Sequence, residues 1–274
     1  MLRKKKRLIL VAGLVLVFSG ATWAYVATRT DKPSETPQQT TEQTPATDQP
    51  VAEKPKDVAK PKTEPNPAEA AAFDKSQYST SEPGSIWWVV NKTRPLPAGY
   101  APEDLITPNV ALSGSYTRYR KIAQTNLEAM FAAAAKADAP LTFGSGFRSE
   151  SAQRQLYNGY VAADGQAAAD RYSARPGTSE HQTGLSFDAG SPSGSCYLEV
   201  CYGKTAQGLW LATHAHEYGF IVRYPNGKEA VTGYQYEPWH MRYVGVKLAT
   251  EMRRTGVTTL EEFFGLPAAP SYKP

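Results

Sequence analysis

Apolar and polar positions repeat with two different periods along residues 73–267, and these periods predict the elements of the fold. Apolar residues at helical spacing predict helices over 116–138, 150–163, 166–172 and 206–218. Short apolar or alternating runs predict strands over 86–90, 141–147, 185–189 and 220–224, and one more just before Tyr243. Because helices and strands mix without a regular βαβ rhythm, we expect one compact α+β domain over 73–267, with a small, mostly antiparallel sheet flanked by helices.

The N-terminal residues follow another pattern. A basic run at 3–7 precedes 21 residues without charge, 8–28, which is long enough to cross a hydrocarbon core of about 30 Å. Positive charge before such a segment keeps the N-terminus in the cytoplasm. We therefore expect a membrane anchor or signal segment over 1–29, with the rest of the chain extracytoplasmic. The chain would be membrane-anchored, or secreted if this segment is cleaved.

Between this segment and the domain, residues 31–72 contain eight prolines and no aromatic residue, Leu or Ile. Such a composition buries too little apolar surface to offset the loss of chain entropy. We expect 30–72 to be a disordered tether and 268–274 to be a short tail.

The net charge of the chain argues against nucleic-acid binding. The chain has 30 Lys and Arg against 26 Asp and Glu, and five of the positive residues lie in the run at 3–7. The remainder is close to neutral, so no basic face for binding nucleic acid is expected.

The chain has four histidines, and two of them lie near acidic residues in a pattern that suits a metal. In the stretch 179–188, Gly184 permits a bend, after which Ser186 and Asp188 share one strand face. His181 and Asp188 can then converge on one cation, and His240 comes three residues after Glu237, so that one turn brings both side chains into a cleft. Two His and one carboxylate, with a fourth position left for water, is a catalytic zinc pattern.

Each of these residues also has a structural interpretation. His181 alone suits a turn, Asp188 a strand-end cap, and Glu237 with His240 a surface pair. His214 and His216 are a rival pair, but residues two apart on a helix point to different faces. Glu180 is a rival to Glu237 as a base.

Several stretches together resemble a known family. They are Ser-x-His-x-x-Gly-x-x-x-Asp at 179–188, Glu-Pro-Trp-His at 237–240, Ser-Gly-Phe-Arg-Ser at 145–149 and Arg-Tyr-Val-Gly at 242–245. They are similar to the VanY-type zinc D-alanyl-D-alanine carboxypeptidases of the lysostaphin, D-Ala-D-Ala peptidase and sonic hedgehog group, from about residue 86 to 264. Ser186 departs from the pattern, which usually has Ala there.

The resemblance implies roles for single residues. It implies Zn²⁺ bound by His181, Asp188 and His240, with Glu237 as the catalytic base. Arg148 would be the cationic group beside the scissile amide, with a structural salt bridge as its alternative. Gln153 and Ser179 would contact the substrate.

Cys196 and Cys201 lie five residues apart in an insertion less general in the family. Outside the cytoplasm, thiols tend to be oxidised, so we expect a loop disulfide. A metal site or free thiols are the alternatives.

From these features we expect a zinc metallopeptidase, anchored to the membrane and facing the cell wall, that removes the C-terminal D-Ala from peptidoglycan stem peptides. The alternatives are an L,D-carboxypeptidase or an endopeptidase on peptidoglycan. From a different class, the alternative is a non-catalytic cell-wall-binding module.

Overall fold

The structure, a computed structural model, describes residues 73–273. The expected membrane segment at 1–29 and tether at 30–72 lie outside these residues. Within the described part of the chain, no helix combines the length and the apolar character needed to cross a membrane.

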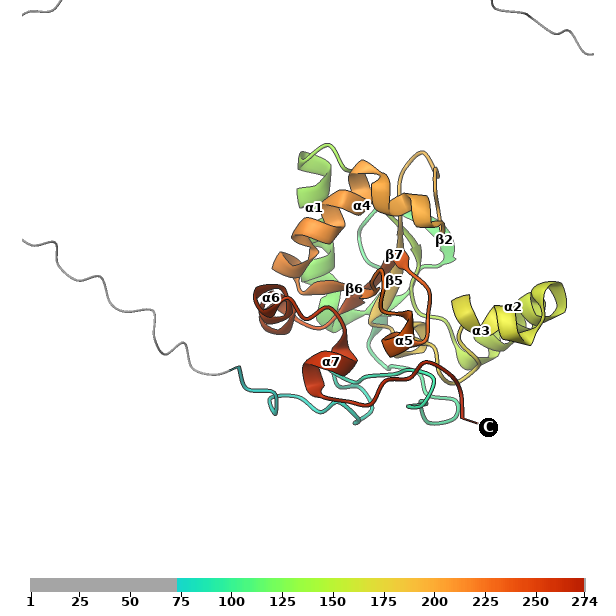
Figure 1. Cartoon of the computed structure of the whole chain (residues 1–274). Helices are drawn as coiled ribbons and strands as arrows, with labels where there is room; N and C mark the ends of the chain where they lie inside the picture. Colours follow the sequence, from blue (N-terminus) through green and yellow to red (C-terminus); the bar gives the residue numbers. More distant parts are fainter. Residues whose placement is uncertain (1–72, 274) are drawn as a thin grey trace, which may run out of the picture. The chain divides into compact units, whose positions relative to one another are not determined.

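A five-stranded mixed sheet forms the centre of the domain (Figure 1). Its strands, in spatial order, are β2 (Leu112–Tyr116), β4 (Thr142–Ser145), β5 (Ser186–Gly190), β7 (Glu237–Tyr243) and β6 (Phe220–Tyr224). Only β2 and β4 pair in parallel; the other three pairings are antiparallel. A separate two-stranded ladder joins β1 (Leu105–Ile106) to β3 (Tyr119–Arg120). The expected α+β class is confirmed.

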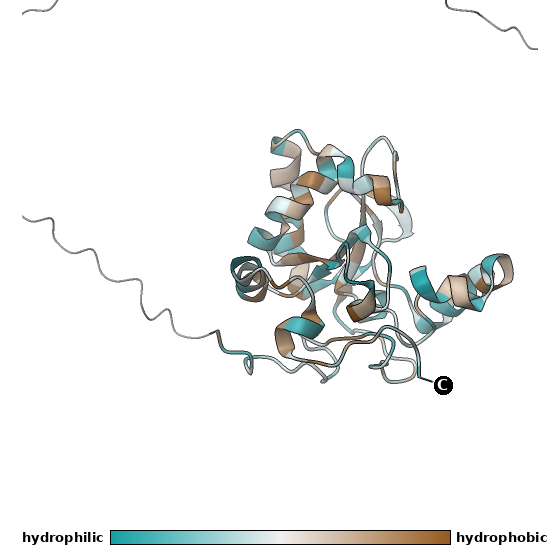
Figure 2. Ribbon diagram, in the orientation of Figure 1, coloured by the Kyte–Doolittle hydropathy of each residue, from teal (hydrophilic) through white to brown (hydrophobic). Residues whose placement is uncertain are grey.

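Helices surround this sheet. They are α1 (Gln124–Lys136), α2 (Glu150–Asp164), α3 (Gln166–Tyr172), α4 (Ala206–His214), α5 (Glu229–Thr232), α6 (Val246–Thr255) and α7 (Leu260–Phe264). Short 3₁₀ turns are η1 (Lys121–Ala123), η2 (Glu180–Thr183), η3 (Val200–Lys204) and η4 (Ala215–Tyr218). Helices α1 and α4 lie together, whereas α2 and α3 form a hairpin that projects to one side (Figure 1). Most helices carry both hydrophilic and hydrophobic stretches (Figure 2), as elements with one buried face do.

Alternation along the central strands separates the core from the polar face. Phe187 of β5 stacks on Phe143 of β4 with ring centroids 5.0 Å apart, and Met241 of β7 is also fully buried. Side chains next to these in sequence point to the other face of the sheet. There Asp188 pairs in register with His240. The strand pairing therefore brings two residues 52 positions apart in the sequence side by side.

Two expected elements differ in the structure. Residues 86–90 were expected to be a strand, but they form no strand. Their side chains are buried in two different places. Trp87 and Val89 belong to the main core, and Trp88 and Val90 belong to a second apolar cluster. A fully buried irregular segment has the same apolar run as a buried strand, which explains the error.

The helix expected over 116–138 begins only at Gln124. The residues before it are the last residue of β2, a short connection at 117–118, β3 and η1. Tyr119 is fully buried there, and its hydroxyl donates a hydrogen bond to the carbonyl oxygen of Leu185 at 2.6 Å. This tertiary contact and the strand preference of aromatic residues override the helical spacing.

The packed domain continues past residue 267. Ala269 is fully buried, and its N–H donates to the carbonyl oxygen of Val231 at 2.8 Å. The Tyr272 hydroxyl accepts a hydrogen bond from the N–H of Arg175 at 2.8 Å. The segment separated above as a tail therefore packs against the domain as far as Tyr272.

Candidate active site

Three elements position the two histidines and the aspartate. Asp188 and His240 come from the paired strands β5 and β7, and His181 comes from η2. Turn η2 is followed by Gly184, which caps it with φ +68°. A Cβ there would lie 2.9 Å from Cγ of Arg120, so glycine suits both the backbone and the space.

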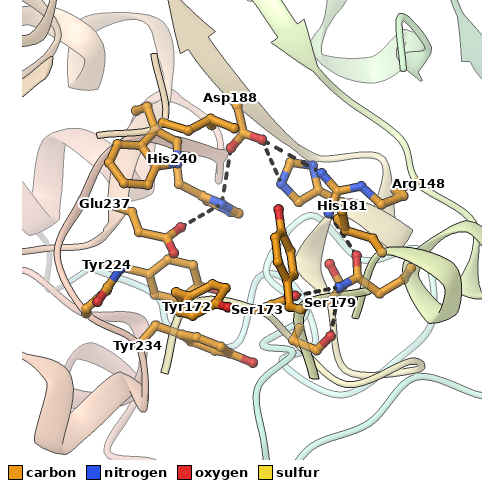
Figure 3. A pocket seen from close by; sticks show the side chains of 17 residues that line it. Arg148, Tyr172, Ser173, Ser179, His181, Asp188, Tyr224, Tyr234, Glu237 and His240 are labelled. Atoms are coloured by element: carbon orange, nitrogen blue, oxygen red, sulfur yellow. Dashed lines mark hydrogen bonds and ion pairs between the residues drawn. The ribbon is translucent and has the colours of Figure 1, made fainter. Parts of the chain in front are cut away.

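The three side chains meet around the Asp188 carboxylate (Figure 3). Nε2 of His181 lies 3.4 Å from Oδ2 of Asp188, and Nδ1 of His240 lies 3.6 Å from Oδ1. All three residues are 4% exposed. One ligand atom from each lies within 4.8 Å of the others. The expected triad is therefore brought together in one place.

The polar atoms of this cluster fit a zinc ion. Oδ1 of Asp188 is buried without a hydrogen-bond partner, and a buried carboxylate oxygen left in this state is costly. Nδ1 of His181 lies 2.8 Å from the carbonyl oxygen of Gly146. If that nitrogen carries the proton, Nε2 keeps its lone pair toward Asp188. Two imidazole nitrogens and one carboxylate oxygen are a donor set that zinc prefers.

Burial and the neighbouring charges together shift the pKa values of the cluster. Burial lowers the pKa of His181, although the neighbouring Asp188 charge opposes this shift. Burial would raise the pKa of Asp188, but the adjacent His181 and His240 outweigh it and the pKa is lowered. A neutral imidazole and an ionised carboxylate are the forms that bind metals.

Glu237 lies beside this cluster because β7 is irregular. Oε2 of Glu237 is 3.5 Å from Nδ1 of His240. Residues three apart on a regular strand face opposite sides, but the pairing shifts from Val222 with Met241 to Tyr224 with Glu237. Two extra β7 residues are accommodated there. A bulged strand, and not the single turn expected from the sequence, therefore brings both side chains to one cleft.

The Glu237 carboxyl is 6% exposed. Burial raises its pKa well above the ordinary value, the negative charge of Asp188 raises it further, and Arg148 opposes both. Such a carboxyl takes up a proton more readily than an exposed one.

Arg148 and Gln153 line the same pocket as the metal-site residues and Glu237. Nη2 of Arg148 lies 3.8 Å from Oδ2 of Asp188, and Nη1 donates to Oε1 of Gln153 at 2.8 Å. Nε2 of Gln153 in turn donates to the carbonyl oxygen of Ala174 at 2.7 Å. Gln153 thus holds the guanidinium in place, while Nε of Arg148 is buried without a partner. Ser179 lines the same pocket.

Glu180, the rival base, lies behind His240. It is 1% exposed, and its Oε1 accepts hydrogen bonds from Arg223 and Arg242, each at 2.7 Å. Its Oε2 accepts one from the Ser186 hydroxyl at 3.0 Å. Both oxygens are therefore engaged away from the pocket.

The remaining candidates lie elsewhere. His214 stacks on Trp210 with ring centroids 5.1 Å apart, and His216 lines a second, more apolar pocket of about 290 Å³. Cys196 and Cys201 form a disulfide. Glu199 lies close enough to make a metal cluster with them, but bridged sulfurs are not thiolate ligands.

A pocket of about 180 Å³ opens over the cluster. Its walls include residues that sequence reasoning missed: Leu156, Tyr160, Tyr172, Leu198, Tyr224 and Tyr234. Tyr160 and Tyr172 come from the α2–α3 hairpin and pack edge to face at 5.1 Å. In the sequence both tyrosines belong to stretches of helical spacing, 150–163 and 166–172, and that spacing gives no signal for a pocket wall.

Comparison with known proteins agrees with this geometry. The profile of the VanY D-alanyl-D-alanine carboxypeptidase family matches residues 117–246. The predicted carboxypeptidase YodJ of Bacillus subtilis is 44% identical over 186 residues, which are 66% of this chain and 68% of YodJ.

Two solved structures are also similar. The LdcB LD-carboxypeptidase, in a structure that concerns peptidoglycan recognition, is 42% identical with a TM-score of 0.63, covering 67% of this chain and 87% of that one. A vancomycin resistance D,D-pentapeptidase VanY from a VanB-type cassette, in complex with Zn(II), is 33% identical with a TM-score of 0.54, covering 64% and 96%. This chain therefore belongs to the VanY D-alanyl-D-alanine carboxypeptidase family and is a carboxypeptidase of that zinc peptidase family.

Proposed function

We propose that this chain is a zinc-dependent L,D-carboxypeptidase that removes the terminal D-Ala from tetrapeptide stems of peptidoglycan. The observation that carries the proposal is its 42% identity to the LdcB LD-carboxypeptidase, against 33% to the VanY D,D-pentapeptidase. From the sequence we expected D,D activity because of the resemblance to the VanY-type enzymes, but the short motifs of the metal site are common to both activities. The higher identity across the whole domain supports L,D activity instead.

His181, Asp188 and His240 would hold the zinc ion. The chemistry that zinc supplies in such a site is that of a Lewis acid, which polarises a carbonyl oxygen and acidifies water. The buried, unpartnered Oδ1 of Asp188 supports this assignment. The three residues are proposed as ligands on this geometry.

Glu237 is the proposed general base. Its carboxylate lies beside His240 and lines the pocket, where it can take a proton from the attacking water. The protonated carboxyl can then return that proton to the leaving amine. General-base assistance of this kind is typically worth about 10²–10⁴-fold in rate.

Arg148 is the proposed cationic group for the substrate. Its buried Nε has no partner within the described residues, so it can donate to an oxygen of the bound peptide. That oxygen belongs either to the terminal carboxylate or to the developing oxyanion. Gln153 orients Arg148 in this account, and Ser179 offers a hydroxyl to the peptide.

The experiment uses the full chain purified in detergent and loaded with zinc. It is incubated separately with a tetrapeptide stem, a pentapeptide stem and a cross-linked dimer, and the products are identified by mass. Release of D-Ala from the tetrapeptide is expected. Release from the pentapeptide alone would mean D,D activity, and cleavage of the dimer alone would mean endopeptidase activity. Membership of a carboxypeptidase family argues against a non-catalytic binding module.

We also propose that the domain lies outside the cytoplasm. The basic run at 3–7 and the uncharged segment at 8–28 favour a domain outside the cytoplasm. Protease added to intact protoplasts should digest the domain while a cytoplasmic marker survives. Protection of both proteins would refute this location.

A further inference from the structure

The chain leaves the metal-bearing strand β5 through a loop that a disulfide closes. Cys196 and Cys201 bridge the loop 196–201. Cys196 has φ +58° and Leu198 has φ +57°. Only three residues other than glycine have positive φ within 73–273, and two of them are in this loop. Leucine adopts this conformation rarely, so surrounding constraints must hold it there.

Tyr197 fixes the same loop to the sheet. Its ring lies against two glycines on neighbouring strands, Gly144 of β4 and Gly190 of β5. A Cβ on Gly144 would lie 2.2 Å from the Tyr197 hydroxyl oxygen, and one on Gly190 would lie 3.2 Å from Cδ2 of the ring. The absence of side chains at both positions gives the ring its place.

This anchor is close to the candidate metal site. Burial raises the pKa of the Tyr197 hydroxyl, and the nearby negative charge of Asp188 raises it further. On the β4 side of β5, Asp188 pairs with Ser145, which is next to Gly144. The loop is therefore attached to the same part of the sheet that carries the aspartate.

Leu198 follows the anchor and lines the pocket. Its side chain is 42% exposed, although it belongs to the wall of the pocket that contains His181, Asp188 and Glu237. The core packing does not account for a partly exposed leucine in a strained backbone conformation. An apolar contact with a bound peptide would account for it, because binding would remove this surface from water.

We propose that the disulfide-closed loop 196–201 positions the substrate, with Leu198 contacting an aliphatic part of the stem peptide and Tyr197 anchoring the loop. This inference rests on the proposed function, since it takes a stem peptide as the occupant of the pocket. The disulfide then limits the loop to conformations in which Leu198 stays in the pocket wall.

Leu198→Gly is the sharpest test, because glycine accepts positive φ without strain. The variant loses the side chain while the backbone conformation is kept. We expect KM for the cleaved stem peptide to rise about five-fold, as for the loss of one partly buried leucine contact. We expect kcat, zinc content and Tm to stay unchanged. A purely structural role would instead lower Tm and leave KM alone. Leu209→Ala is the control, since Leu209 is 57% exposed on α4 and outside the pocket wall.

Breaking the Cys196–Cys201 disulfide should raise KM because Leu198 then loses its contact with the peptide. Cys196→Ser with Cys201→Ser, or reduction of the wild type with a phosphine, should raise KM by a similar factor without loss of zinc. Adding Leu198→Gly to the serine variant should change KM little further, because both changes remove one interaction.

The outcomes separate the two proposals. If the wild type releases D-Ala but Leu198→Gly and the serine variant keep the wild-type KM, the inference is wrong and the proposed function stands. If the wild type cleaves no stem peptide, the proposed function and this inference both fail.

Discussion

Nε2 of His240 lies 3.7 Å from Oε2 of Glu180, while Nδ1 of the same ring faces Asp188. Burial would raise the pKa of the Glu180 carboxyl, but Arg242 and Arg223 outweigh it and hold that pKa well below its usual range. A charged carboxylate thus lies just beyond hydrogen-bond distance of a proposed ligand. Carboxylates in this position fix the orientation of a ligating imidazole and strengthen metal binding.

Replacing Glu180 with Gln should therefore weaken zinc binding by about 10–100-fold, the usual effect of losing such a partner. Titration of the folded protein against a chelating zinc indicator measures this. Ser186→Ala is the matched control, because it removes only the hydroxyl that donates to Oε2 of Glu180. It should weaken binding much less. Equal zinc affinity in Glu180→Gln and the wild type would show that Glu180 does not support His240.

The zinc content of the chain should be about one ion per molecule. His181→Ala and His240→Ala should each lose it, because each removes one of three proposed ligands. His216→Ala should keep it, since His216 lines the other pocket. Elemental analysis after dialysis gives the result, and zinc retained by both of the first two variants would refute the site.

The disulfide should contribute modestly to stability. Closing a loop as short as 196–201 removes unfolded-state entropy worth about 2 kcal/mol by loop-length scaling. Reduction should expose two thiols and lower the free energy of unfolding by no more than about that amount. Thiol titration and urea unfolding test this, and two reactive thiols in the untreated protein would contradict the bridge.

A buried ion-pair cluster should make the fold sensitive to acid. Oε1 of Glu261 lies 2.7 Å from Nη2 of Arg223, and both side chains are fully buried. Burial would raise the pKa of Glu261, but Arg223 outweighs it and the pKa is lowered. A lowered folded pKa stabilises the protein above the unfolded value of about 4.3, and this stabilisation is lost as the pH falls further.

Glu261→Gln should consequently cost about 3–5 kcal/mol at pH 7, because it leaves Arg223 less compensated. The difference from the wild type should shrink below about pH 4, because the Glu261 carboxyl of the unfolded wild-type chain takes up a proton there and the folded one does not. Urea unfolding at pH 7 and pH 3.5 compares the two. If the difference in the free energy of unfolding is the same at both pH values, the Glu261 carboxylate is not the cause of the acid sensitivity.

Much of the site could be predicted from the sequence because its signals are local. His181, Gly184 and Asp188 lie within eight residues, and strand alternation alone puts Asp188 on the polar face. The strands at 185–189 and 220–224 were expected within one residue of their observed bounds. Local pattern is sufficient where one face of an element is buried and the other is not.

The rest depended on contacts between distant residues. The bulge that turns Glu237 toward His240 exists only in the pairing of β6 with β7. From the sequence Glu180 is a possible base. The structure shows that it accepts hydrogen bonds from Arg223 and Arg242, which are 43 and 62 residues away in the sequence. The two glycines that contact the Tyr197 ring, Gly144 and Gly190, lie on two different strands. The hydrophobic periodicity of the sequence does not encode contacts between residues that are far apart in the chain.

Glu237 is proposed to transfer protons without binding the metal. Glu237→Gln keeps the shape and volume of the side chain but removes the proton acceptor. Asp188→Asn weakens a charged ligand, so it should lower zinc occupancy and activity together. The two variants therefore separate chemistry from metal binding.

The most direct measurement is the rate of D-Ala release from a stem peptide by zinc-loaded Glu237→Gln, with zinc content and Tm determined on the same sample. We predict a rate about 10²–10⁴-fold below the wild type, with zinc content and Tm unchanged. Full activity in this variant, or loss of zinc as extensive as in Asp188→Asn, would contradict the account.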